Sequence, residues 1–222
     1  MLTRRTALGA LLSPLFLTGC GLGSGESYRY RMTVVVDTPE GPRSGSSVIE
    51  VRAHPTGPLA ASVFNRRSYG EAPFVDLPGR RTLFALLSNK PDGYNAGDEY
   101  PQFAYADAVP RGLGWREQAR ALKRQTSSAM LPPEHYPQLV TFRDPKDVTS
   151  IEIVDPADLA ASFGAGIALR NIEIAITSDP VTKRLSGRLP NFGPSSGYDQ
   201  WARQLHVGDP RLVTLDDFQR NS

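Results

Sequence analysis

The first twenty residues constrain this chain most, because they separate a removable leader from the part that folds. Arg4 and Arg5 give a positive start, and an apolar run follows over residues 7–17. This order, ending in small residues, is typical of a secretory signal. The apolar run is about half the roughly 20 residues that a membrane span needs. The sequence therefore predicts a signal peptide over residues 1–19.

The leader ends in Leu17-Thr18-Gly19-Cys20, which resembles a bacterial lipobox. The resemblance implies a diacylglycerol group on the Cys20 thiol, cleavage before Cys20 and acylation of the new amine. We therefore expect a membrane anchor at Cys20 and a Gly/Ser-rich tether over residues 20–27. The alternative is a buried structural cysteine in an N-terminal helix.

The flanking residues bear on the export route and on the destination. The Arg4-Arg5 pair resembles a twin-arginine motif but lacks Phe two residues later, so both general secretory and twin-arginine export stay open. Gly21, where some lipoproteins have Asp, favours the outer membrane. We expect an envelope protein that is lipid-anchored and faces the periplasm.

Composition limits the chemistry of the mature chain. Removing 19 of 222 residues leaves 203, with 25 − 2 = 23 basic and 23 acidic side chains. A formal net charge of zero argues against nucleic acid as a partner. Cys20 is the one cysteine of the sequence, which rules out an intramolecular disulfide and, once lipidated, a thiolate metal site. We expect no metal and no cofactor.

Gly and Pro together make up 39 of 222 residues, well above the usual share of about 12%, which favours turns and short strands. We predict an α+β fold, predominantly antiparallel β, in one domain over residues 28–222. It should contain about seven short strands and two or three short helices. The predicted strands cover residues 28–37, 46–53, 74–77, 82–87, 138–142, 149–154 and 169–177. The predicted helices or helical turns cover residues 115–125, 159–163, 180–188 and 198–206, with Thr214 capping a last turn and Asp155 capping the second.

The polar stretch over residues 88–110 reads as a long loop and is the first candidate for a ligand site. It combines carboxylates with aromatic rings, a pairing that can bind or cleave sugars, and carboxylates can also bind calcium. The alternative is a solvated loop whose tyrosines pack on the domain edge. The candidate ligand residues are Asp92, Tyr94, Asp98, Glu99, Tyr100 and Tyr105.

The histidines offer weaker candidates. His54, His135 and His206 lie next to Pro or Gly or within two residues of one and lack metal-ligand spacing, so we expect them in surface turns. Ser46 or Ser47 with His206 and Asp209 would supply a Ser–His–Asp set. Neither Ser46 nor Ser47 stands in a Gly-x-Ser-x-Gly elbow, so no catalytic residue is assigned.

The predicted helix over residues 115–125 is amphipathic. Trp115, Ala119 and Leu122 form the inner stripe. Four cations, Arg116, Arg120, Lys123 and Arg124, form the outer face. This basic face suits anionic headgroups or an acidic partner, or it is simply solvated.

Two further regions resemble a family of uncharacterised proteobacterial proteins. The first is Thr38-Pro39-Glu40-Gly41 with Ser44 to Val51, and the second runs from Leu139-Val140-Thr141-Phe142 to Leu189-Pro190. The resemblance implies one bacterial domain and assigns no site residue.

These features predict a lipid-anchored protein of the bacterial envelope. We expect a non-catalytic binding or assembly module, whose partner is another envelope protein or a glycan. The alternative is an envelope hydrolase or glycan-acting enzyme that uses the carboxylates of residues 88–110.

Overall fold

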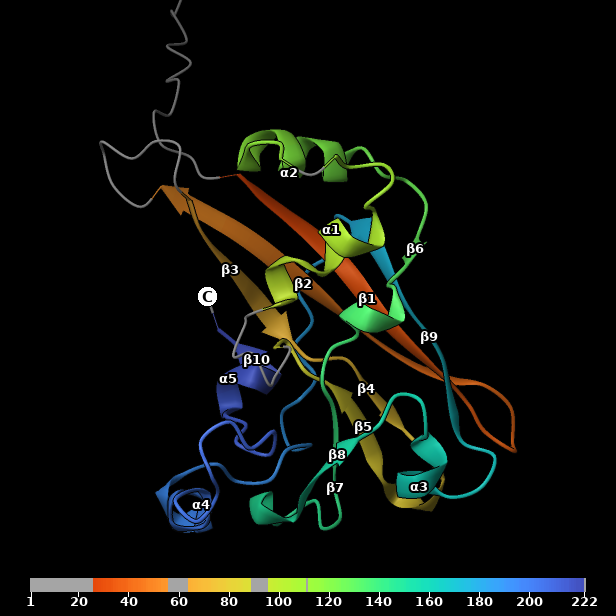
Figure 1. Cartoon of the computed structure of the whole chain (residues 1–222), viewed down its shortest axis with the longest axis vertical. Helices are drawn as coiled ribbons and strands as arrows, with labels where there is room; N and C mark the ends of the chain where they lie inside the picture. Colours follow the sequence, from red (N-terminus) through yellow and green to blue (C-terminus); the bar gives the residue numbers. More distant parts are fainter. Residues whose placement is uncertain (1–25, 56–63, 89–95, 111, 222) are drawn as a thin grey trace, which may run out of the picture.

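In the computed structural model, the described residues are 26–55, 64–88, 96–110 and 112–221. They form two antiparallel sheets with short helices around them (Figure 1). This confirms the predicted α+β fold, rich in antiparallel β-structure. The larger sheet has the order β10-β3-β2-β1-β9-β6, and the smaller has the order β4-β5-β7-β8.

The strand bounds follow. The larger sheet contains β1 (Ser27–Asp37), β2 (Arg43–Pro55), β3 (Phe64–Glu71), β6 (Ala129–Met130), β9 (Ala168–Thr177) and β10 (Gln219–Arg220). The smaller sheet contains β4 (Phe74–Asp76), β5 (Thr82–Ala85), β7 (Leu139–Phe142) and β8 (Ile151–Val154).

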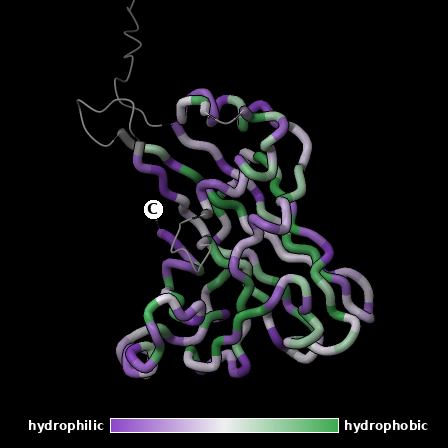
Figure 2. Tube along the Cα trace, in the orientation of Figure 1, coloured by the Kyte–Doolittle hydropathy of each residue, from purple (hydrophilic) through white to green (hydrophobic). Residues whose placement is uncertain are grey.

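Strand β1 is the inner strand around which the larger sheet forms. Every second residue from Tyr28 to Val36 is buried, as the alternation of apolar and polar residues predicts. β2 pairs with one edge of β1 and β9 with the other, both antiparallel. The opposite face of β1 is half-buried and carries Arg29, Arg31 and Asp37, so β1 packs on the core with one face. Figure 2 shows hydrophobic residues gathered along the inner strands.

The α-helices are short. They are α1 (Tyr100–Ala104), α2 (Trp115–Lys123), α3 (Leu159–Phe163), α4 (Tyr198–Ala202) and α5 (Leu215–Phe218). The 3-10 helices are η1 (Pro78–Arg80), η2 (Ala96–Asp98), η3 (Pro133–His135), η4 (Val148–Ser150) and η5 (Pro194–Ser196). Among the described residues, no helix is long and apolar enough to cross a membrane.

Helix α2 covers the inner face of the larger sheet at one end of the molecule, and the smaller sheet lies toward the other end (Figure 1). The predicted inner stripe of α2 is confirmed, because Trp115, Ala119 and Leu122 are all buried. The Trp115 ring packs on Tyr28 of β1 with 5.6 Å between ring centroids.

An aromatic cluster joins the smaller sheet to the C-terminal segment. Phe84 and Phe142 each lie close to Phe218, with ring centroids 5.6 and 5.9 Å away. Phe192 adds a ring 5.6 Å from Phe218. One continuous core therefore runs through both sheets, from Tyr28 to Phe218.

Several sequence-based expectations are wrong. Residues 180–188 contain no helix: Thr182 hydrogen-bonds Val48 of β2, and a single turn follows over residues 185–188. Residues 96–104 are not irregular, since they form η2 and α1. Asp158 caps α3 through the Ala161 amide, whereas we expected Asp155 to do so. Strands β3, β6 and β10 were not predicted.

Candidate functional site

Two of the predicted carboxylates, Asp98 and Glu99, form a partly buried ion-pair cluster with Arg66 of β3. The Arg66 Nε lies 3.2 Å from an Asp98 carboxylate oxygen, and a terminal nitrogen of Arg66 lies 3.0 Å from Glu99. The same guanidinium lies 5.7 Å from the Trp115 ring centroid. One cation therefore holds both carboxylates and packs against the core.

The surroundings of Asp98 are also buried. Its side chain is 10% exposed, and burial raises the pKa of Asp98 to about 6, although Arg66 favours the charged form. The Tyr28 hydroxyl donates to the Asp98 backbone oxygen at 3.2 Å, and the Tyr30 hydroxyl donates to the Gly97 oxygen at 2.5 Å. These bonds fix η2 on the inner face of β1.

The predicted tyrosines belong to the same core. Tyr100 is fully buried, and the Tyr105 hydroxyl donates to the backbone oxygens of Ser127 at 2.7 Å and Ile174 at 3.0 Å. Asp92 and Tyr94 lie outside the described residues. The solvated-loop interpretation is therefore wrong for residues 97–100, and the geometry of Asp98 and Glu99 is that of a structural ion pair.

The Ser–His–Asp set is only partly assembled. The His206 Nδ1 lies 3.6 Å from Asp209, but Arg211 binds the same carboxylate at 2.7 Å. Ser46 accepts a hydrogen bond from Arg31 at 3.4 Å, and Ser47 is buried in β2. Between these serines and His206 the described residues contain no hydrogen bond.

The other two histidines lie in different elements. His135 of η3 stacks on Phe103 at 3.7 Å between ring centroids. His54 lies in strand β2 and not in a turn, which corrects the expectation. Over residues 26–55, 64–88, 96–110 and 112–221, no group of three or more His, Cys, Asp or Glu side chains has the arrangement of a metal site.

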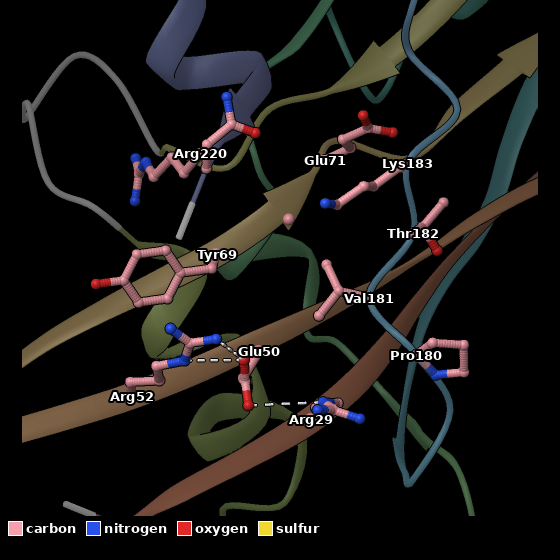
Figure 3. Close-up of a pocket in the computed structure, with 12 residues that line it drawn as sticks. Arg29, Glu50, Arg52, Tyr69, Glu71, Pro180, Val181, Thr182, Lys183 and Arg220 are labelled. Atoms are coloured by element: carbon pink, nitrogen blue, oxygen red, sulfur yellow. Dashed lines mark hydrogen bonds and ion pairs between the residues drawn. The ribbon is translucent and has the colours of Figure 1, made fainter.

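A cleft of about 480 Å³ opens on the charged face of the larger sheet, and we call it the outer-face cleft (Figure 3). It forms where β3 ends its pairing with β2 at Tyr69–Glu50 and residues 180–184 take its place beside β2. The residues that line it are Arg29, Glu50, Arg52, Tyr69, Gly70, Glu71, Pro180, Val181, Thr182, Lys183, Arg220 and Asn221.

Residues 180–184 form one wall of the outer-face cleft, and hydrogen bonds hold them in place. The Thr182 amide donates to the Val48 oxygen at 3.1 Å, and the Val48 amide donates to the Thr182 hydroxyl at 2.9 Å. The Glu71 carboxylate accepts from the backbone amides of Leu185, at 2.9 Å, and Arg184. Residues 180–184 therefore sit at a fixed distance from β3.

The floor of the outer-face cleft carries a preformed set of charges. The Glu50 side chain is 9% exposed and lies between Arg52, at 2.6 Å, and Arg29, at 3.6 Å. The Arg52 guanidinium also stacks over Tyr69, 4.7 Å from the ring centroid. Glu50 thus contacts both arginines, and the Arg29 guanidinium also donates to the backbone oxygens of Ser178, at 3.4 Å, and Asp179, at 3.3 Å.

The balance of charge in the outer-face cleft is positive. Four lining side chains are cationic and two are acidic, which gives a net charge of +2. The acid Glu71 is already engaged by backbone amides. Lys183 is exposed and extends over the cleft toward Tyr69 and Arg220 (Figure 3). Such an arrangement suits an oxyanion, because guanidinium and ammonium groups are its usual donors.

Sequence reasoning missed this cleft. The outward position of Arg29 was visible in the alternation of β1, and Arg52 follows the same period in β2. No local pattern indicated that residues 180–184 would lie beside Glu50.

The predicted basic face lies where it was expected. Arg116, Arg120, Lys123 and Arg124 are all exposed on α2. Glu26 reaches this face, with its carboxylate 2.9 Å from Lys123 Nζ and 3.5 Å from Arg120 Nε. Arg4, Arg5, Leu17, Gly19 and Cys20 lie outside the described residues.

Comparisons with known proteins assign no family. No protein-family model, curated protein or solved structure matches the chain. The resemblance to uncharacterised proteobacterial proteins stays a prediction.

Proposed function

We propose that this protein is a lipid-anchored, non-catalytic binding module of the bacterial envelope, and that the outer-face cleft is its ligand site. The leader and the lipobox-like Leu17-Thr18-Gly19-Cys20 support the anchor. The ligand is a small soluble molecule that carries oxyanion groups, either carboxylate or phosphate.

One observation carries this proposal: two arginines are held on the buried Glu50 at the floor of a cleft that Lys183 overhangs. A ligand carboxylate or phosphate would meet the outer N–H groups of Arg29 and Arg52 and the Lys183 ammonium. Because Glu50 orients the arginines before binding, little side-chain entropy is lost when the ligand enters. Tyr69 adds an aromatic wall.

Nothing in this arrangement calls for catalysis. The cleft contains no histidine or serine among its described lining residues, and its two carboxylates are held by arginines and by backbone amides. Asp98 and Glu99, the residues of the alternative glycan-acting enzyme, share Arg66 and lie on the other face of the sheet.

Calorimetric titration of the full-length protein in detergent, at low ionic strength, tests the proposal. The probes are citrate, inorganic phosphate and, as a neutral control, glucose. We expect citrate or phosphate to bind and glucose not to bind; which anion binds more tightly distinguishes a carboxylate ligand from a phosphate ligand.

Two variants locate the binding. Lys183→Glu should weaken anion binding about threefold to tenfold, since reversing one charge at the edge of a site changes the binding free energy by roughly 1 kcal/mol. Arg52→Gln should also weaken it, because the floor of the cleft loses one of the two cations that Glu50 holds in place. Lys146→Glu, on the exposed turn between β7 and β8, is the matched control. Absence of anion binding, or equal effects of the two lysine variants, would contradict the proposal.

A further inference from the structure

The point at which the chain enters the domain lies against helix α2. Glu26, the residue before β1, contacts Lys123 and Arg120 through its carboxylate. Its backbone oxygen accepts a hydrogen bond from the Ala53 amide at 3.2 Å. Hydrogen bonding from Lys123 lowers the pKa of Glu26, so these contacts persist at neutral pH. The start of β1 is thereby tied both to β2 and to α2.

The chain between Cys20 and Glu26 is short. Six residue steps separate the two positions, and a fully extended chain covers at most about 22 Å in that number of steps. If acyl chains hold Cys20 at a membrane, Glu26 must stay within this distance of it. Because Glu26 touches α2, the helix is confined to the same zone.

The surface that α2 presents in this zone is basic. Arg116, Arg120, Lys123 and Arg124 are exposed, and the acids beside them are Glu117 and Glu26, which leaves a local net charge of +2. Leu113, just before the helix, is a large hydrophobic side chain with 37% exposure. Cationic side chains beside an exposed apolar residue are the composition of surfaces that rest on lipid headgroups.

We propose that the outer face of α2 docks on the anionic phospholipid headgroups of the membrane that holds Cys20. This inference rests on the lipid anchor of the proposed function. The anchor raises the local concentration of headgroups near α2, so a modest basic face is enough for contact.

Docking sets the orientation of the domain. In Figure 1, α2 lies at one end of the molecule, and α4 and the smaller sheet lie at the other. With α2 on the headgroups, the smaller sheet points away from the membrane. The outer-face cleft lies on the face of the larger sheet opposite the one that α2 covers, so this docking leaves it open to soluble ligands.

Fluorescence quenching on vesicles tests the orientation. The sequence has one cysteine, Cys20, so in the lipidated mature protein an introduced cysteine is the one free thiol. Thr126→Cys, just after α2, and Gln200→Cys, on α4, each place a fluorophore at an exposed position. The vesicles contain headgroup-labelled quencher lipid in phosphatidylcholine, with or without 30% phosphatidylglycerol.

We expect the label at residue 126 to be quenched at least threefold more in phosphatidylglycerol vesicles than in pure phosphatidylcholine, and 0.5 M salt should abolish the difference. The label at residue 200 should show little quenching in either. Adding Arg116→Glu and Arg124→Glu should remove the effect at residue 126, whereas the matched change Arg203→Glu, just after α4, should not.

Cosedimentation with the same vesicles separates the two proposals. One outcome is that the protein cosediments while quenching of the label at residue 126 changes neither with phosphatidylglycerol nor with the charge reversals. In that case the docking is wrong and the anchor stands. If the unaltered protein fails to cosediment with either vesicle, the anchor is wrong and the docking falls with it.

Discussion

Gly45 of β2 lies directly against the backbone of Phe74 in β4, so closely that a Cβ atom at position 45 would sit 1.6 Å from the Phe74 carbonyl oxygen. This approach is where the two sheets meet. No side chain other than hydrogen fits there. Glycine is required for this close approach and not for its backbone conformation, which is not left-handed.

Gly45→Ala should therefore separate β2 from β4 and destabilise the protein by at least about 2 kcal/mol. Gly193→Ala is the matched control, since its added methyl would meet only the side chain of Asn191. Urea unfolding of both variants measures the difference. Equal stability of the two would show that the sheets do not meet as closely as described.

Arg66 forms ion pairs with two carboxylates, Asp98 and Glu99, at the edge of the core. Arg66→Ala would leave the 10% exposed Asp98 carboxylate without its cation, so we expect a loss of about 2 kcal/mol in the free energy of unfolding. The neighbouring Arg67 is exposed on the other face of β3. Arg67→Ala should change stability by less than about 0.5 kcal/mol. A similar loss in both variants would contradict the structural role of Arg66.

Asp98 should make stability depend on pH. Its pKa is about 6 in the folded protein against an ordinary value of 3.8, so between these values the folded state keeps a proton that the unfolded chain releases. Stability contributed by Asp98 is thus fully present below pH 4 and falls as pH rises to 6, by an amount on the order of 3 kcal/mol.

Unfolding measured at several pH values between 4 and 7 checks this. In the unaltered protein the free energy of unfolding should decrease as pH rises in that window, whereas in Asp98→Asn this decrease should be absent. Asp107→Asn changes an exposed carboxyl a few residues away and should retain it. Parallel curves for the protein and Asp98→Asn would refute the raised pKa.

Thr214 holds the first turn of α5. Its amide and its hydroxyl both donate to the Asp217 carboxylate, at 2.6 and 3.0 Å. Thr214→Ala removes the hydroxyl bond and should cost about 1 kcal/mol of stability, typical of a helix cap. Ser186→Ala, at an exposed position outside helices and strands, provides the comparison in the same urea unfolding measurement.

The fold was predictable where one strand face is apolar. β1 and β9 alternate clearly because one face packs on the core and the other is charged. β3 was not predicted because its inward residues include Arg66 and Ser68, which are polar and interrupt the alternation of apolar and polar residues. Their partners, Asp98 for Arg66 and Arg220 for Ser68, come from distant parts of the chain. Local periodicity cannot reveal an inward polar residue whose partner is remote.

The candidate site was less predictable than the fold. Asp98 and Tyr100 stand in a polar stretch that looks solvated, yet the hydroxyls of Tyr28 and Tyr30 bind its backbone and draw it into the core. The outer-face cleft depends on Thr182 bonding to Val48, a contact between residues 134 positions apart. The basic face of α2 was found because helical spacing alone determines which residues share a face.

The anchor at Cys20 is the claim on which both the envelope location and the docking of α2 depend, and intact mass spectrometry of the membrane-extracted protein tests it most directly. We predict a chain that begins at Cys20, carries a diacylglycerol group and an amide-linked acyl chain there, and lacks residues 1–19. In Cys20→Ser the lipid mass should disappear and the protein should leave the membrane fraction. A chain that still begins at Met1, or an unmodified Cys20, would contradict the account.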